Sequence, residues 1–176
     1  MEHKAGYVNI IGNPNVGKST LMNALIGERL SIITPKAQTT RHRIIGILNE
    51  KDYQIVFSDT PGVIDPAYQL QENMMNSVYS AFSDADILIY MVEVGEKTLK
   101  DPKISERLRK TEIPLLMLLN KIDLAKQEDV AIELEKWSSD FTNAEILPIS
   151  ALNKFNLDII KDKIVKMLPI APPYYD

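Results

Sequence analysis

The sequence predicts an α/β domain in three layers, a mostly parallel six-stranded sheet with one antiparallel strand and helices on both faces. Short apolar runs alternate with helical patterns along the chain, as in proteins built from βα units. Two neighbouring runs are separated only by a short polar turn, which indicates one antiparallel hairpin. A glycine-containing loop joins the first run to the first helical pattern, and this arrangement is typical of a phosphate-binding loop.

The first third of the chain supplies the loop, the hairpin and one helix. The apolar residues of Tyr7–Ile11 predict the first strand, and those of Leu21–Ile26 predict the helix that follows it. The polar stretch 31–40 predicts a long loop. The segments 43–48 and 53–57 predict the two strands of the hairpin.

The middle of the chain continues the alternation of strands and helices. We expect one helix at about 69–82 and another over Pro102–Lys110, where proline occupies the first helical position. The apolar segment Ile87–Val94 predicts a buried strand. Leu115–Leu119 is apolar at every position and therefore predicts a strand that is covered on both faces.

The last third of the chain completes the domain. We expect a helix at about 127–137, a strand at 145–149 and a final helix at about 156–168. The domain is expected to span 1–170, followed by the stub of an extended linker at 171–176. One stripe of the final helix carries Leu157, Ile160, Ile164, Val165 and Leu168.

Composition narrows the class of protein. Of the 176 residues, 45% are hydrophobic and 25% are charged, which is ordinary for a single globular domain. A net charge of −4 argues against a general affinity of this chain itself for nucleic acid. Because the chain has no cysteine, a disulfide framework and a thiolate metal site are excluded, and a reducing, cytoplasmic location is expected. We expect no signal peptide and no transmembrane segment.

The loop Gly12–Ser19, with the sequence GNPNVGKS, predicts a site for a polyphosphate. Backbone N–H groups and the start of the following helix would surround the anion. Lys18 would add a point charge near the phosphates, and the Ser19 hydroxyl would bind Mg²⁺. The alternative is an ordinary glycine turn between a strand and a helix. The phosphate-binding residues predicted here are Asn13, Asn15, Val16, Gly17, Lys18, Ser19 and Thr20.

Two further segments are candidates for the metal and the terminal phosphate. Asp59 ends a predicted strand and can hold Mg²⁺ through water, while the Gly62 N–H can approach a γ-phosphate. A turn that begins with aspartate is the common alternative. Thr40 is chosen as a Mg²⁺ ligand over Thr39 because it lies nearer the next strand, and it would bind only while a γ-phosphate orders the loop.

The segment Asn120–Asp123 is the candidate for recognising the base of a bound nucleotide. The Asp123 carboxylate can accept two hydrogen bonds from guanine, and adenine offers no such pair of donors. Asn120 would bond the base edge or brace the loops, and the stem of Lys121 would lie against the ring. The alternative is a helix start that is capped by aspartate. A later strand ends in Ser150, Ala151 and Leu152, where the Ala151 N–H would approach the guanine O6 atom.

With these motifs in this order, the chain resembles the translation-factor-like branch of P-loop GTPases, and within that branch the Era family. The segment 36–43, with the sequence KAQTTRHR, is the part most particular to that family. The resemblance extends to about Leu168 and implies a P-loop GTPase domain. Era-like proteins carry a KH-type domain after the GTPase domain, and we expect that domain to be absent from this chain.

The resemblance implies a Mg²⁺-dependent GTP-binding switch that slowly hydrolyses GTP to GDP and phosphate and acts in small ribosomal subunit assembly. The implied partners are GTP or GDP and, through the missing KH-type domain, the small subunit and its rRNA. Peripheral membrane association of the full-length protein is compatible with the resemblance. The alternatives are a related GTPase of tRNA modification or large-subunit assembly, and a nucleotide-responsive binding module with negligible turnover.

No catalytic residue is assigned from the sequence. Ras-like enzymes place a water-orienting glutamine where this chain has Val63, so slow hydrolysis is expected, with Lys18 stabilising phosphate charge. Related GTPases with an asparagine at the position of Asn15 use it to help bind K⁺, which makes Asn15 a candidate K⁺ ligand. The alternative is that Asn15 only tolerates the backbone conformation of the loop.

Overall fold

The computed structural model describes residues 2–13, 16–27, 43–59, 82–97, 99 and 102–175. The expected long loop at 31–40 lies outside these residues, and so does the expected helix at 69–82 except for its last residue, Phe82.

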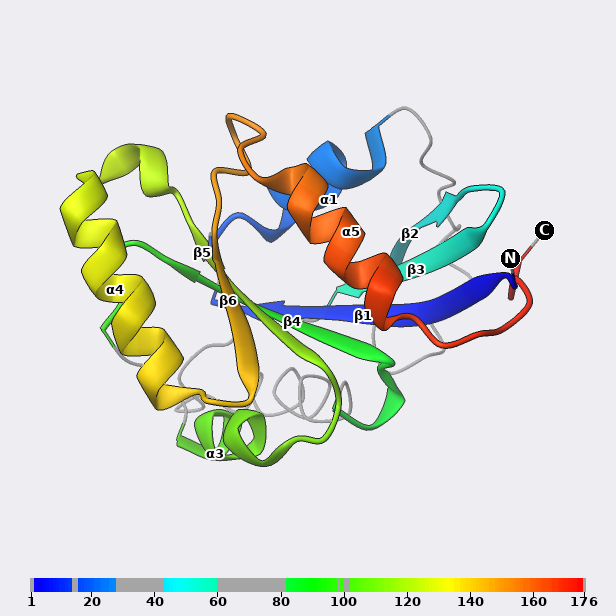
Figure 1. Ribbon diagram of the computed structural model, residues 1–176, viewed down its shortest axis with the longest axis horizontal. Coiled ribbons are helices and arrows are strands. Elements are labelled where there is room, and N and C mark those ends of the chain that lie inside the picture. The colour runs from blue at the N-terminus through cyan, green and yellow to red at the C-terminus, as the bar shows by residue number, and fades with distance from the viewer. Residues whose placement is uncertain are drawn as a thin grey trace.

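The described strands form one six-stranded sheet in the order β2-β3-β1-β4-β5-β6 (Figure 1). All neighbouring strands are parallel except β2, which runs antiparallel to β3. The predicted sheet is therefore confirmed, including the hairpin and its single antiparallel strand. The strands are β1 (Lys4–Gly12), β2 (Arg43–Asn49), β3 (Tyr53–Asp59), β4 (Ile87–Glu93), β5 (Leu115–Asn120) and β6 (Ala144–Pro148).

Helices cover both faces of the sheet, as predicted. Residues of α1 and α5 share one buried cluster with the strands, and residues of α3 and α4 share the other. Figure 1 shows α1 and α5 side by side on one face, away from α3. The helices are α1 (Lys18–Ile26), α3 (Pro102–Lys110), α4 (Gln127–Asp140) and α5 (Leu157–Met167), with a short 3₁₀ helix, η3 (Ile122–Leu124).

The α4 helix ends at Asp140, beyond the predicted end at Trp137. Tertiary packing explains the extension. Phe141 is fully buried, its ring lies 6.1 Å from that of Trp137, and its N–H donates to the Trp137 carbonyl at 2.9 Å. Burial of these two rings holds a last turn whose own residues, two serines and an aspartate, are weak helix formers.

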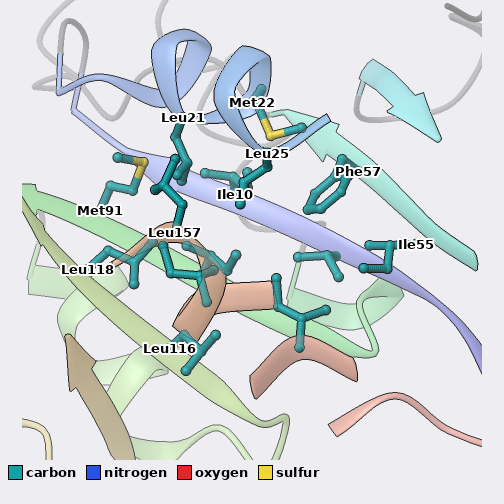
Figure 2. Packing of buried hydrophobic residues seen from close by; sticks show 14 of the residues in the cluster. Ile10, Leu21, Met22, Leu25, Ile55, Phe57, Met91, Leu116, Leu118 and Leu157 are labelled. Atoms are coloured by element: carbon teal, nitrogen blue, oxygen red, sulfur yellow. The ribbon is translucent and has the colours of Figure 1, made fainter. Parts of the chain in front are cut away.

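The two buried clusters fix the sheet between its helices. In Figure 2, Leu21 and Leu25 of α1 lie over Ile10 of β1, with Phe57 of β3 in the same cluster. All of Leu115–Leu119 is buried, so the expectation that this strand is covered on both faces is confirmed. The predicted stripe of α5 is buried at Leu157, Ile160, Ile164 and Leu168, and Val165 is partly buried.

The carboxyl ends of the parallel strands meet at one edge of the sheet, because β1, β3, β4, β5 and β6 all run in the same direction. In open α/β sheets this edge is where ligands bind. It carries Gly12, Asp59, Glu93, Asn120 and Pro148 as the last residues of the five strands.

The chain after α5 turns back to the opposite edge, beside the start of β1 (Figure 1). The Ala5 N–H donates to the Pro169 carbonyl at 3.2 Å, and the Ala171 N–H donates to the His3 carbonyl at 3.0 Å. Further on, the buried Gln54 side chain accepts the Tyr174 N–H at 2.7 Å. The segment that was expected to be a linker stub therefore contacts the sheet. In the described ranges, no helix combines the length and apolar character that crossing a bilayer requires.

Candidate nucleotide-binding site

The glycine loop connects β1 to α1 as predicted, and Gly17 is its most constrained residue. Gly17 has φ +110°, a conformation that side chains other than hydrogen strongly disfavour. A Cβ atom at this position would also lie only 2.3 Å from Nδ2 of Asn120. Both the backbone conformation and the close approach of Asn120 therefore require glycine.

The start of α1 is suited to bind an anion. Its N-cap residue is Gly17, which has no side chain to cap the helix, and the first turn holds no acidic residue. Uncapped N–H groups and the positive end of the helix dipole favour a negatively charged ligand. Lys18, Ser19 and Thr20 form the first turn, and the two hydroxyl residues are exposed. Asn15 lies outside the described residues.

Asn120 braces the phosphate loop against the loop after β6. Its Nδ2 donates to the Val16 carbonyl at 2.9 Å, and its Oδ1 accepts the Ala151 N–H at 3.0 Å. The residue is only 3% exposed. Of the two roles predicted for Asn120, the structure shows the brace between loops.

The same contact concerns the role predicted for Ala151. Its N–H was expected to approach the guanine O6 atom, whereas the structure shows it donating to Asn120. An approach to a base would have to share this donor. Ala151 and Ser150 are buried, while Leu152 is 75% exposed next to them.

Asp123 lies at the same edge and is oriented by Ser150. The Ser150 hydroxyl donates to Asp123 Oδ1 at 2.9 Å and accepts the Asn153 N–H at 3.2 Å. Asp123 sits within η3 and caps no helix, since Lys126 occupies the N-cap position of α4. The alternative reading of Asp123 as a helix cap is therefore wrong, and its carboxylate is exposed at the strand ends.

The residues predicted for the metal are only partly within the described structure. Asp59 ends β3 and pairs with Ile10 of β1, so its backbone lies beside the strand that enters the phosphate loop. Ser19 lies in the first turn of α1. Thr40 and Gly62 are outside the described residues, as is Val63, on which the expectation of slow hydrolysis rests.

Two glutamates that were not among the predicted site residues also contact the site. Glu93, the last residue of β4, forms an ion pair with Lys121. Glu96 accepts a hydrogen bond from Asn13 in the phosphate loop at 3.1 Å. Their position could have indicated them, because Glu93 ends a buried strand and Glu96 follows it closely, at the edge where the predicted site residues also lie.

This fold and this site together define a P-loop GTPase domain, and the comparisons with known proteins agree. Residues 7–121 match the family model described as 50S ribosome-binding GTPase. The chain is 44% identical over 173 residues to GTPase Era of Clostridium beijerinckii, an alignment that covers 98% of this chain and 58% of the relative.

Solved structures show the same likeness. A variant of Aquifex aeolicus Era bound to GDP·AlF4⁻ superposes with a TM-score of 0.80 at 36% identity, over 98% of this chain and 60% of that chain. Era in complex with MgGDPNP and nucleotides 1506–1542 of 16S ribosomal RNA gives the same TM-score and identity, over 99% and 60%. The chain belongs to the Era family of GTPases. It spans somewhat more than half the length of these relatives.

Proposed function

We propose that this chain is the GTP-binding domain of a Mg²⁺-dependent switch that slowly hydrolyses GTP to GDP and phosphate. The observation that carries this proposal is the double contact of Asn120 with Val16 and Ala151. It joins the phosphate loop to the loop beside Asp123, so that a polyphosphate and a guanine base would be bound by one connected site.

The nucleotide would lie across the strand ends. Its phosphates would lie at Asn13, Asn15, Val16, Gly17, Lys18, Ser19, Thr20 and Gly62, and its base at Asn120, Lys121, Asp123, Ser150, Ala151 and Leu152. Era structures that contain MgGDPNP and GDP·AlF4⁻ support the choice of a guanine nucleotide with Mg²⁺.

The types of residue proposed as metal ligands suit a magnesium ion. Mg²⁺ prefers oxygen ligands and usually keeps several waters beside one or two carboxylates. Ser19 and Asp59 would supply a hydroxyl and a carboxylate, with Thr40 as a third ligand. When bound, the metal neutralises charge on the phosphates, while Lys18 contributes a second positive charge. Asn15 is proposed as a K⁺ ligand, and equal hydrolysis rates in K⁺ and Na⁺ would contradict this assignment.

The biological role is proposed from the relatives. One solved Era structure holds part of the 16S ribosomal RNA, which supports a role in small ribosomal subunit assembly. The net charge of −4 makes this chain a poor RNA-binding surface, so rRNA contact would be made by a KH-type domain elsewhere in the full-length protein. We place the protein in the cytoplasm, with peripheral membrane association as a further proposal.

Nucleotide competition and single-turnover hydrolysis test the proposal together. GTP and GDP should displace a fluorescent guanine nucleotide from the chain, and ATP should not compete at similar concentrations. Phosphate release in a single turnover should be slow but measurable with Mg²⁺. Equal competition by ATP would contradict the base assignment, whereas tight GTP binding without GDP formation over hours would favour a binding module over an enzyme.

A further inference from the structure

The loop formed by the end of β4 and the residues after it, 93–97, contacts the base side of the candidate site. Oε2 of Glu93 lies 2.5 Å from the ammonium of Lys121, and the two side chains are 36% and 33% exposed, respectively. A partly buried ion pair loses less to solvent screening than one on the open surface. Since Lys121 follows β5 directly, this contact constrains where its aliphatic stem lies at the strand ends.

The same loop also contacts the phosphate side. Nδ2 of Asn13 donates to Oε2 of Glu96 at 3.1 Å, and the Glu93 N–H donates to Oε1 of the same carboxylate at 3.1 Å. The Asn13 carbonyl in turn accepts the Val16 N–H at 3.3 Å. One carboxylate thus connects the end of β4 with the turn of the phosphate loop.

The loop is itself held by α4. The Gly95 N–H donates to Oε1 of Glu133 at 2.8 Å, and the Lys136 ammonium donates to the Lys97 carbonyl. Both bonds come from the long helix α4, which packs against the sheet through Trp137. The loop is therefore attached to the core and not only to the two site loops.

We propose that residues 93–97 form a positioning loop for the nucleotide, in which Glu93 orients Lys121 and Glu96 orients the phosphate loop through Asn13. The inference rests on the proposed function, because it assigns Lys121 and Asn13 to a bound nucleotide. The two possible roles of these carboxylates, electrostatic repulsion and positioning, predict opposite changes in nucleotide affinity when the charge is removed. A carboxylate that acted only through its charge would repel a polyphosphate, so its neutralisation would tighten binding. A positioning carboxylate predicts weaker binding on neutralisation.

The experiment measures the dissociation rate of a fluorescent GDP analogue from the whole chain. The variants are Glu93→Gln and Glu96→Gln, with Glu135→Gln as the matched charge control, because Glu135 is exposed on α4. We expect dissociation about three- to tenfold faster in the two loop variants and within about twofold of wild type in the control. Urea unfolding of each variant is measured in parallel.

Double-mutant cycles distinguish positioning from a general loss of stability. Glu93→Gln should have little further effect in a Lys121→Met background, and Glu96→Gln should have little further effect in an Asn13→Ala background. Glu93→Gln and Asn13→Ala should instead be additive, since the structure gives their side chains different partners. Additive effects within both contacting pairs would overturn the proposal.

Unchanged or slower dissociation in both loop variants would also overturn the positioning role, and GDP binding by the wild-type chain would still support the proposed function. A wild-type chain that binds no guanine nucleotide would contradict the proposed function instead. Nucleotide-free protein then still tests the Glu96 contact, because Glu96→Gln should accelerate amide hydrogen exchange at Val16. Unaltered exchange there would reject the link to the phosphate loop.

Discussion

Asp123 is the residue on which base selectivity should depend. Ser150 fixes one of its oxygens, so the carboxylate is presented in a defined orientation at the strand ends. Guanine would donate to both carboxylate oxygens from N1–H and the exocyclic amine. Xanthine carries a carbonyl in place of that amine, so it would require a donor at the same position.

We therefore expect Asp123→Asn to reduce GDP affinity by about two orders of magnitude and to improve the affinity for XDP. The amide would supply the donor that the xanthine carbonyl needs. Competition against a fluorescent nucleotide measures both changes. Asp129→Asn, on the exposed first turn of α4, is the matched control and should leave both affinities unchanged. A uniform loss for both nucleotides would contradict direct base recognition.

Gly17 offers a second test at the residue scale, with Gly27 as its matched control. Gly17 precedes α1 and Gly27 follows it, and both have a positive φ, of +110° and +57° respectively. A Cβ atom would come close to Asn120 only at Gly17. Gly27→Ala should cost about 1–3 kcal/mol of unfolding free energy from backbone strain, because φ +57° with ψ −137° is a conformation that other residues rarely adopt. Gly17→Ala should cost more and should also weaken GDP binding, because it displaces the Asn120 brace.

Urea unfolding and nucleotide titration measure these two effects separately. Equal losses of unfolding free energy in the two glycine variants, with GDP binding retained in both, would show that the close approach of Asn120 to Gly17 is unimportant.

At the scale of elements, α5 is held by one apolar stripe. Ile160 is fully buried against the sheet, whereas its neighbour Ile159 is 42% exposed. Truncation of a buried isoleucine removes transfer free energy and leaves a cavity.

Ile160→Ala should therefore lower the unfolding free energy by about 2–5 kcal/mol, and Ile159→Ala by less than about 1 kcal/mol. Urea denaturation gives both values from the same change of residue type at adjacent positions. A similar loss at both positions would mean that α5 is not anchored by this stripe.

Local signals explain which elements the sequence could predict. The helix α3 has the predicted bounds because Pro102 marks its start, and the continuous apolar run of β5 identifies a strand buried on both faces. The end of α4 was missed because it depends on the burial of Phe141, which is a tertiary contact. The contacts of Glu93 and Glu96 could not be predicted for the same reason, since a glutamate at or just after the end of a strand carries no local sign of its partner.

At the scale of the whole molecule, residues near both ends of the chain form hydrogen bonds at the edge of the sheet that lies opposite the candidate site. Gln54 binds the backbone of Tyr174 and Tyr175, and the rings of Tyr7 and Tyr174 lie 5.0 Å apart. Burial, together with a hydrogen bond to Tyr175, raises the pKa of Tyr7 to about 12. The folded chain therefore retains the Tyr7 proton at a pH where the unfolded chain has lost it.

This difference in pKa sets the direction of a pH effect. The stabilisation from neutral Tyr7 is complete below its unfolded pKa of about 10 and is lost as the pH rises toward the folded value of about 12. Wild-type protein should thus lose more unfolding free energy between about pH 9 and pH 11 than Tyr7→Phe does. Urea midpoints at the two pH values measure the difference. Equal losses would contradict the contribution of this phenol, because the lysines titrate in both proteins.

The contact of residues 169–171 with the start of β1 also bears on where the protein can be labelled or immobilised. His3 and Ala171 are hydrogen-bonded to each other, at the edge of the sheet away from Asn120 and Asp123. A surface tether or a fluorescent label fused at either end would therefore leave the opposite edge open to solvent. Immobilised protein should accept nucleotide as readily as free protein, and a probe at one end should report on a probe at the other over a very short distance.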